Sequence, residues 1–179
     1  MQVGLSSIPK VDRAPQDEYN PFYAGYISLI PEHDVVHFII DQHDRFKSYL
    51  SSLEERQLKY AYAEGKWTVA QVIGHVIDTE RVMAYRAMCI SRGEDTPLPG
   101  FDQDRYMAYS NFNQRDKASL IREFDSLRQA TIEMICAMSI EQLNSIGNAN
   151  GSECSVRAVI SIIGGHLEHH FKMLKEKYI

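Results

Sequence analysis

The sequence predicts an all-α protein: a four-helix bundle with an N-terminal arm and a long loop between its second and third helices. Four segments of roughly 20 residues repeat apolar side chains at intervals of three and four, which is the spacing of one face of an α-helix. Alternating β-branched stretches are few, and we identify no hairpin dipeptide between strands. The 179 residues, 44% of them hydrophobic, suffice for one buried core. We therefore assign residues 1–30 to the arm and 31–179 to the bundle domain.

The arm is expected to pack on the bundle, because it combines helix-breaking prolines with more aromatic residues than a disordered tail carries. These residues are Pro9, Pro15, Pro21, Tyr19, Phe22, Tyr23 and Tyr26. The N-terminus lacks the apolar stretch of a signal peptide, and no segment approaches the roughly 18 apolar residues that span a bilayer. We expect a cytoplasmic protein that does not enter a membrane.

The first helix is predicted to start at Pro31, since proline suits the first helical position and Glu32 and Asp34 suit a helix N-terminus. Its inner face is marked by Val36, Ile39, His43, Phe46, Leu50 and Leu53. The second helix starts after Thr68, which forms a capping-box pattern with Gln71, and ends before Gly93 and Pro97. Its inner face carries Val69, Val72, Val76, Met83 and Ile90.

The third helix is predicted from the same spacing, and a second capping-box pattern at Ser139 and Gln142 predicts a short helical turn after it. The third helix presents Leu120, Phe124, Leu127, Thr131, Met134 and Met138. The fourth helix runs from about Ser155 to about Tyr178 and presents Val156, Val159, Ile163, His166, His170 and Met173.

Two connections, residues 92–114 and 144–154, are long for a compact bundle. Loops of this length often serve as functional lids, and others only cover a hydrophobic end. Both interpretations stay open at this point.

The composition excludes some classes of function. A formal charge of -5 and an isoelectric point near 5.8 argue against nucleic-acid binding. The three cysteines, Cys89, Cys136 and Cys154, are too far apart for a CxxC site and indicate reduced, ordinary apolar side chains. No Gly-rich phosphate loop, GxSxG elbow or HExxH motif is present.

His166 and His170 are the most informative residues, because they lie one helical turn apart on an apolar face. They are either hydrogen-bonded core residues or two ligands of one metal ion. Two inward imidazoles each lose hydration on burial, which favours a shared metal. His75, beside the inner face of the second helix, is the best third ligand.

Other polar residues are weaker candidates. Asp78 and Glu80 either orient ligands or are solvated charges. His33 and His37 form a second pair at this spacing, but they fall at the edge of their helix face and are expected to be exposed. His43 falls on the apolar face and is either a core residue or a neighbour of the site. Arg86, Arg157 and Tyr106 either contact an acidic reactant or serve in packing and ion pairs.

Three nitrogen ligands would leave a divalent ion with an open position, which is typical of catalytic sites. Water or a thiol at that position loses its proton near neutral pH. Hydrolysis, thiol transfer and isomerisation are compatible with this chemistry.

The chain resembles the DinB superfamily of metal-dependent four-helix proteins. The resemblance rests on Trp67–Arg81, on Thr96–Asp102, and on Ser155–Ala158 followed by Gly165–His170. It implies an up-down-down-up bundle, often a homodimer, with nickel, zinc or another divalent ion (iron, manganese) at the open end. The implied ligands are His75, His166 and His170, with His169 as an alternative to His170.

The resemblance implies a metal-dependent enzyme in which a low-molecular-weight thiol or water attacks a small electrophilic substrate. Such an enzyme would be a thiol S-transferase or a hydrolase. The alternative is a non-catalytic, dimeric bundle in which the metal serves only structure.

Overall fold

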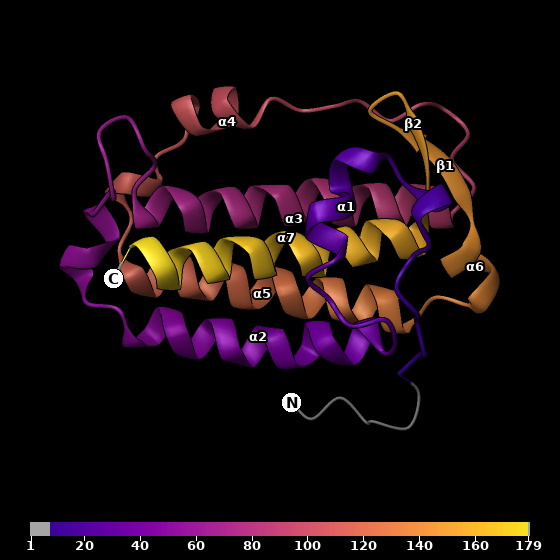
Figure 1. Cartoon of the computed structure of the whole chain (residues 1–179), viewed down its shortest axis with the longest axis horizontal. Helices are drawn as coiled ribbons and strands as arrows, with labels where there is room; N and C mark the ends of the chain where they lie inside the picture. The colour runs from indigo at the N-terminus through magenta and orange to yellow at the C-terminus, as the bar shows by residue number, and fades with distance from the viewer. Residues whose placement is uncertain (1–7, 179) are drawn as a thin grey trace.

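Four long helices form the body of the protein in a computed structural model that describes residues 8–178 (Figure 1). They are α2 (Val35–Ser52), α3 (Val69–Ser91), α5 (Lys117–Cys136) and α7 (Val156–Lys177). Helices α3 and α5 run in one direction and α2 and α7 in the other, so the order is up-down-down-up (Figure 1). The predicted fold class is confirmed.

The helices begin where the sequence provides side-chain caps. The Thr68 hydroxyl accepts a hydrogen bond from the Gln71 amide at 3.2 Å, and the Gln71 side chain accepts one from the Thr68 amide at 3.0 Å. Ser139 and Gln142 form the same capping box at α6 (Ile140–Asn144). These contacts satisfy backbone donors that a helix start leaves free.

The predicted start of the first helix at Pro31 is wrong. Helix α2 begins four residues later, after Asp34, which adopts a left-handed conformation with φ 57°. Backbone hydrogen bonds from Arg13 N to Glu32 O (2.8 Å) and from Val35 N to Val11 O (2.9 Å) tie this segment to the arm. The pairing with the arm holds residues 31–34 outside the helix.

The arm crosses the bundle over α7 (Figure 1). It contains the short helices η2 (Gln16–Glu18), η3 (Pro21–Tyr23) and α1 (Ala24–Ile27), while residues 1–7 lie outside the described part. Gly165 permits the close approach, because a Cβ atom there would lie 2.3 Å from the carbonyl oxygen of Tyr26. Glu18 fixes the arm further through ion pairing with Arg157 and a hydrogen bond from the Ser155 hydroxyl at 2.6 Å.

Replacing Glu18 by glutamine is expected to destabilise the protein by roughly 1 kcal/mol at pH 7, with a smaller effect in acid. The hydrogen bond from Arg157 lowers the pKa of Glu18 in the folded state. A lowered folded-state pKa contributes stability above the unfolded-state pKa, and this stability is lost as the pH falls through the folded-state value. Urea unfolding at pH 7 and pH 3 measures this difference, and an equal loss at both pH values would contradict it.

The two long connections are structured. Residues 92–114 contain α4 (Gln103–Tyr109) and η5 (Phe112–Gln114), and residues 144–154 lie largely in a hairpin of β1 (Ile146–Ala149) and β2 (Ser152–Ser155). The absence of a hairpin dipeptide was therefore a wrong prediction. Asn150 and Gly151 both have positive φ angles, 55° and 76°, as a two-residue hairpin turn requires.

The remaining connection, between α2 and α3, contains η4 (Glu55–Lys59). Across residues 8–178, no helix combines the length and apolarity that crossing a membrane would need.

Candidate metal centre

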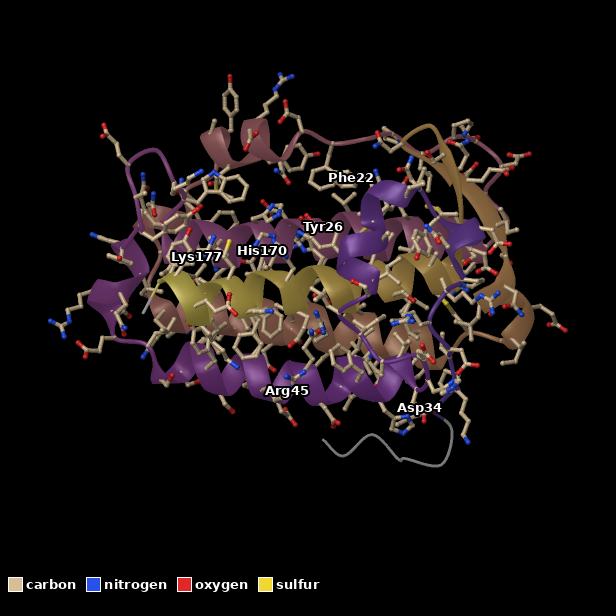
Figure 2. The ribbon with its side chains drawn as sticks, viewed as in Figure 1. Phe22, Tyr26, Asp34, Arg45, His170 and Lys177 are labelled. Carbon is tan, nitrogen blue, oxygen red and sulfur yellow. The ribbon has the colours of Figure 1, made fainter. Side chains whose placement is uncertain are left out.

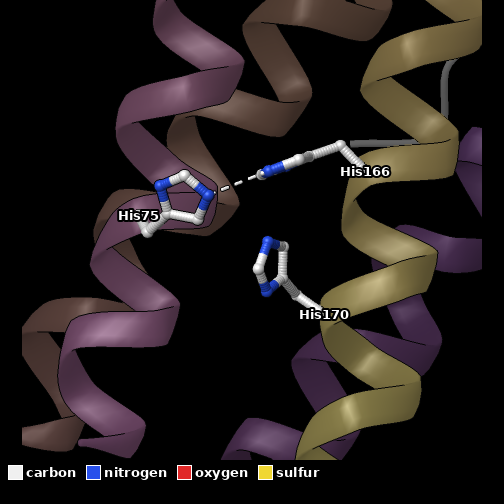
Figure 3. Close-up of side chains that lie close together, drawn as sticks. All are labelled: His75, His166 and His170. Atoms are coloured by element: carbon white, nitrogen blue, oxygen red, sulfur yellow. Dashed lines mark hydrogen bonds between the residues drawn. The ribbon is translucent and has the colours of Figure 1, made fainter. Parts of the chain in front are cut away.

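Three imidazoles converge between α3 and α7 (Figure 3). His75 comes from α3, and His166 and His170 come from successive turns of α7. Each offers one possible ligand atom, and these atoms lie within 4.8 Å of one another. The Nε2 atoms of His75 and His166 are 3.0 Å apart. The structure therefore brings together the three residues that the sequence singled out.

The cluster lies well inside both helices. His75 is the seventh residue of α3, and His166 is the eleventh of α7. Helices α3 and α7 run in opposite directions (Figure 1), so the pair near the middle of α7 meets the first third of α3.

Burial keeps the imidazoles neutral. His75 is 4% exposed, and His166 and His170 are each 7% exposed. Burial, helped by the charge of His169, lowers the pKa of His75 to about 4. Burial and the charges of His75 and His169 lower the pKa of His170 to about 3, and burial places the pKa of His166 well below its usual value. Each ring is therefore uncharged at neutral pH and has one nitrogen lone pair available for a metal ion.

The donor set fits a divalent metal ion. Nitrogen ligands on one tetrahedral zinc ion lie about 3.3 Å apart, which is close to the His75–His166 separation. One ring nitrogen of His170 faces His75 and His166, while its buried Nδ1 lies on the opposite side of the ring (Figure 3). Neither nitrogen has a hydrogen-bond partner within residues 8–178, so the nitrogen that faces the other two rings is available to a further group. Three imidazoles suit zinc, nickel, iron or copper, so the donor set does not select one metal.

Neighbouring residues orient and cover the rings. Thr79 Oγ1 lies 3.5 Å from Nδ1 of His75, and the indole of Trp67 packs against the same ring with centroids 4.9 Å apart. Tyr26 lies on the arm (Figure 2). Its ring packs against that of His166 with ring centroids 5.4 Å apart. His169 is exposed, contacts Tyr26, and is not part of the cluster.

The other candidate histidines lie elsewhere. His33 and His37 are exposed, as predicted, and His33 Nδ1 lies 2.9 Å from a carboxylate oxygen of Asp12. His43 is buried, and its Nε2 lies 2.7 Å from a carboxylate oxygen of Asp125. None of the three approaches the cluster.

The candidate carboxylates of α3, Asp78 and Glu80, lie near arginines. Asp78 is half-buried near Arg81, and Glu80 is buried in an ion pair with Arg128. The interpretation of Glu80 as a solvated charge is wrong, because Arg128 on α5 is buried opposite it and forms an ion pair with it. Among the hydrogen bonds of residues 8–178, no carboxylate contacts His75, His166 or His170.

A cavity of about 230 Å³ opens beside the cluster. Two histidines of the cluster, His75 and His166, form part of the cavity wall. The other lining residues come from α3, α7, the arm and both long connections: Phe22, Tyr23, Tyr26, Thr79, Met83, Arg86, Phe101, Gln103, Asn150 and Ile162. Residues 92–114 thus line the cavity through Phe101 and Gln103. Sequence reasoning missed most of this wall, because its parts are far apart in the chain.

Of the three residues proposed to contact an acidic reactant, only Arg86 lines the cavity. Arg157 pairs with Glu18, and Tyr106 is 47% exposed with its ring against Phe101.

Comparison with known proteins supports the same assignment of family and fold. The family model described as the DinB superfamily matches residues 39–174. A protein of Oceanobacillus iheyensis named "Putative metal-dependent hydrolase OB0413" is 25% identical over 134 residues, covering 74% of this chain and 76% of that protein. A Bacillus cereus protein with the same type of name is 23% identical over 122 residues, covering 68% and 70%.

Two solved structures share the fold. YfiT from Bacillus subtilis, described as a probable metal-dependent hydrolase with an unusual four-helix bundle topology, aligns with a TM-score of 0.70. The alignment covers 92% of this chain and 91% of that one at 15% identity. A mycothiol-dependent maleylpyruvate isomerase aligns with a TM-score of 0.63 and 15% identity, covering 76% of this chain and 58% of its own.

Proposed function

The chain belongs to the DinB superfamily, and from this premise we propose that it is a divalent-metal-dependent enzyme whose ligands are His75, His166 and His170. Its substrate is a small electrophilic molecule, and its nucleophile is water or a low-molecular-weight thiol. The enzyme is accordingly a hydrolase or a thiol S-transferase. Its relatives named as metal-dependent hydrolases support the metal and the first of these reactions.

The convergence of three neutral, buried imidazoles carries the proposal. Burying three polar rings costs free energy unless each finds a partner, and the side chain of His170 makes no hydrogen bond within residues 8–178. A shared cation satisfies the three ring nitrogens that face one another. Nickel and zinc are the metals that the family resemblance favours, with iron and manganese as alternatives.

His75, His166 and His170 would hold the divalent ion, which would lower the pKa of water or a thiol and so supply a nucleophile near pH 7. The chain's own residues prepare the site. Thr79 lies within reach of His75 Nδ1 and fixes the orientation of that ring. Tyr26 covers His166 and excludes water from that side. Burial raises the pKa of Tyr26, so its phenol stays protonated and can donate a hydrogen bond to a substrate in the cavity.

The cavity favours catalysis over the alternative of a purely structural metal. A structural site is closed by protein ligands, whereas a catalytic site needs space for a reactant beside its open position. The walls formed by His75 and His166 border about 230 Å³ of space. That space is adequate for a small molecule.

Metal analysis of purified variants tests the proposal. Wild-type protein is expected to hold about one divalent ion per chain, and His75→Ala, His166→Ala and His170→Ala are each expected to retain less than about a tenth of it, because loss of one of three ligands weakens the site severely. Mass spectrometry of the elements gives both the amount and the identity of the metal.

The exposed His169 provides the matched control. His169→Ala removes an exposed imidazole that packs against His170 but is not one of the three clustered ligands, so its metal content is expected to equal that of the wild type. Undiminished metal in all three cluster variants would contradict the proposal. Loss of metal in His169→Ala together with its retention in His170→Ala would move the third ligand to His169.

A further inference from the structure

Arg86 is a buried cation without a buried counter-charge. It lies on α3, is 3% exposed, and has no carboxylate within salt-bridge distance among residues 8–178. Its Nη2 donates to the carbonyl oxygen of Pro99 at 2.7 Å, and its Nη1 lies 3.7 Å from the sulfur of Met83. Its Nε is buried with no partner in the described chain. Several N–H donors of this guanidinium are therefore available.

The second buried arginine shows how the same fold neutralises such a charge. Arg128 is fully buried, and its Nε and Nη2 donate to the carboxylate of Glu80 at 2.8 to 3.1 Å. Its Nη1 donates to the side-chain oxygen of Gln42 at 3.2 Å. A buried charge without such a partner costs several kcal/mol. An anion bound from outside would give Arg86 the partner that residues 8–178 do not provide.

The surroundings of Arg86 place that anion in the cavity beside the histidines. His75, Thr79, Met83 and Arg86 follow one another on α3 at intervals of four, four and three residues, so they line one side of the cavity. Eleven residues of helix separate His75 from Arg86, a rise of about 16 Å. Both side chains nevertheless line the same cavity.

The rest of the wall has no negative charge. No aspartate or glutamate lines this cavity, and four aromatic rings from the arm and from residues 92–114 do: Phe22, Tyr23, Tyr26 and Phe101. The guanidinium carbon of Arg86 lies 6.0 Å from the centre of the Phe101 ring. The cavity is thus lined by one cation, by two of the clustered histidines, and by aromatic rings that contact both, since Phe101 lies against Arg86 and Tyr26 against His166.

We propose that the cavity binds an elongated small carboxylate whose anionic group pairs with Arg86 and whose apolar or aromatic body lies among these rings. Arginine suits this role, because its planar donors match the two oxygens of a carboxylate. The far end of such a molecule reaches the histidines; this statement, and the role of Arg86 in selecting substrates, rest on the proposed function. Arg86 is thus a specificity-determining residue that selects acidic substrates.

Two probes of the same shape and different charge test the proposal, 3-phenylpropanoate and 3-phenylpropanamide. Each is titrated calorimetrically into the metal-loaded protein and into protein stripped with a chelator. The wild type is expected to bind the propanoate at least tenfold more tightly than the propanamide in both forms, since a hydrogen bond to a charged group contributes about 1.5 to 3 kcal/mol. In Arg86→Met the propanoate is expected to lose at least that tenfold, and the propanamide less than twofold.

Arg81→Met is the matched control. Arg81 lies on the same helix, is 46% exposed in its side chain, pairs with Asp78 and Glu123, and does not line the cavity. Its loss removes the same charge and is expected to leave the affinity for the propanoate unchanged. An equal drop in both arginine variants would show a general charge effect and overturn the proposal.

The remaining outcomes are also decisive. Equal affinities of the wild type for the two probes, or no binding of the propanoate, overturn the proposal even if Arg86→Met does not fold. A preference for the propanoate that disappears with the chelator and survives in Arg86→Met would place the anion on a metal ion, which would support the proposed function and refute the role of Arg86. If the preference for the propanoate depends on Arg86 in a protein that holds no metal, the role of Arg86 is supported and the proposed function is refuted.

Discussion

Replacing Glu80 by alanine is expected to lower the free energy of unfolding by about 3 to 5 kcal/mol, because it leaves a buried arginine without its counter-charge. Arg128 is fully buried and Glu80 is 3% exposed, so water cannot replace the lost carboxylate without opening the core. Both oxygens of Glu80 accept hydrogen bonds from Arg128. Urea unfolding at pH 7, followed by circular dichroism, measures the change.

Two further variants separate the buried pair from surface electrostatics. Glu123→Ala removes a carboxylate that is 24% exposed and pairs with Arg81 and Arg115, and we expect a loss of at most about 1 kcal/mol. The double variant Glu80→Met, Arg128→Met removes both buried charges and is expected to recover most of the stability lost in Glu80→Ala. A loss below 1 kcal/mol in Glu80→Ala would show that the pair is not buried in solution.

This pair also connects the core to the candidate metal centre. Gln42 accepts a hydrogen bond from Arg128 and donates to the carbonyl oxygen of Gly164 at 3.0 Å and to the carboxylate of Glu168 at 2.7 Å. Gly164 and Glu168 flank His166 on α7. The network therefore holds α7 in a fixed position relative to α2 and α5, and with it the spacing between the rings of His166 and His75.

Local signals in the sequence predicted the scaffold and the cluster. Apolar spacing and capping residues depend on neighbours within one or two helical turns, so they can be recognised without tertiary structure. His166 and His170 could be recognised in the same way, because their spacing places two polar imidazoles on the apolar face of a helix, where buried apolar side chains are expected. His75 was less certain, because only the packing of α3 against α7 shows which of its residues face the pair.

Features that depend on distant contacts were not predicted. The start of α2 is set by backbone pairing with the arm, and the burial of Glu80 is set by an arginine 48 residues away. Arg128 stands between Phe124 and Thr131 on the inner face of its helix, and this position was a signal that could have revealed the ion pair.

The hairpin is a different case, because its signal is local. The Asn150–Gly151 dipeptide is typical of a two-residue hairpin turn and could have predicted it.

Removing a bound metal from the protein is expected to lower its free energy of unfolding by about 3 to 4 kcal/mol when the free metal had been present at a few hundred to a thousand times its dissociation constant. The reason is that an ion held only by the folded cluster stabilises the folded state by mass action, since the unfolded chain does not bring residues 75, 166 and 170 together. Urea unfolding with added zinc or nickel, compared with unfolding in excess chelator, gives this difference. His169→Ala is expected to preserve this difference, and His166→Ala to abolish it, because His166 is one of the three clustered imidazoles and its Nε2 lies 3.0 Å from Nε2 of His75. Equal stability of the wild type with metal and with chelator would mean that the three rings do not hold a cation. The 3.0 Å contact between His75 and His166 would then be an ordinary hydrogen bond between a protonated and an unprotonated imidazole nitrogen.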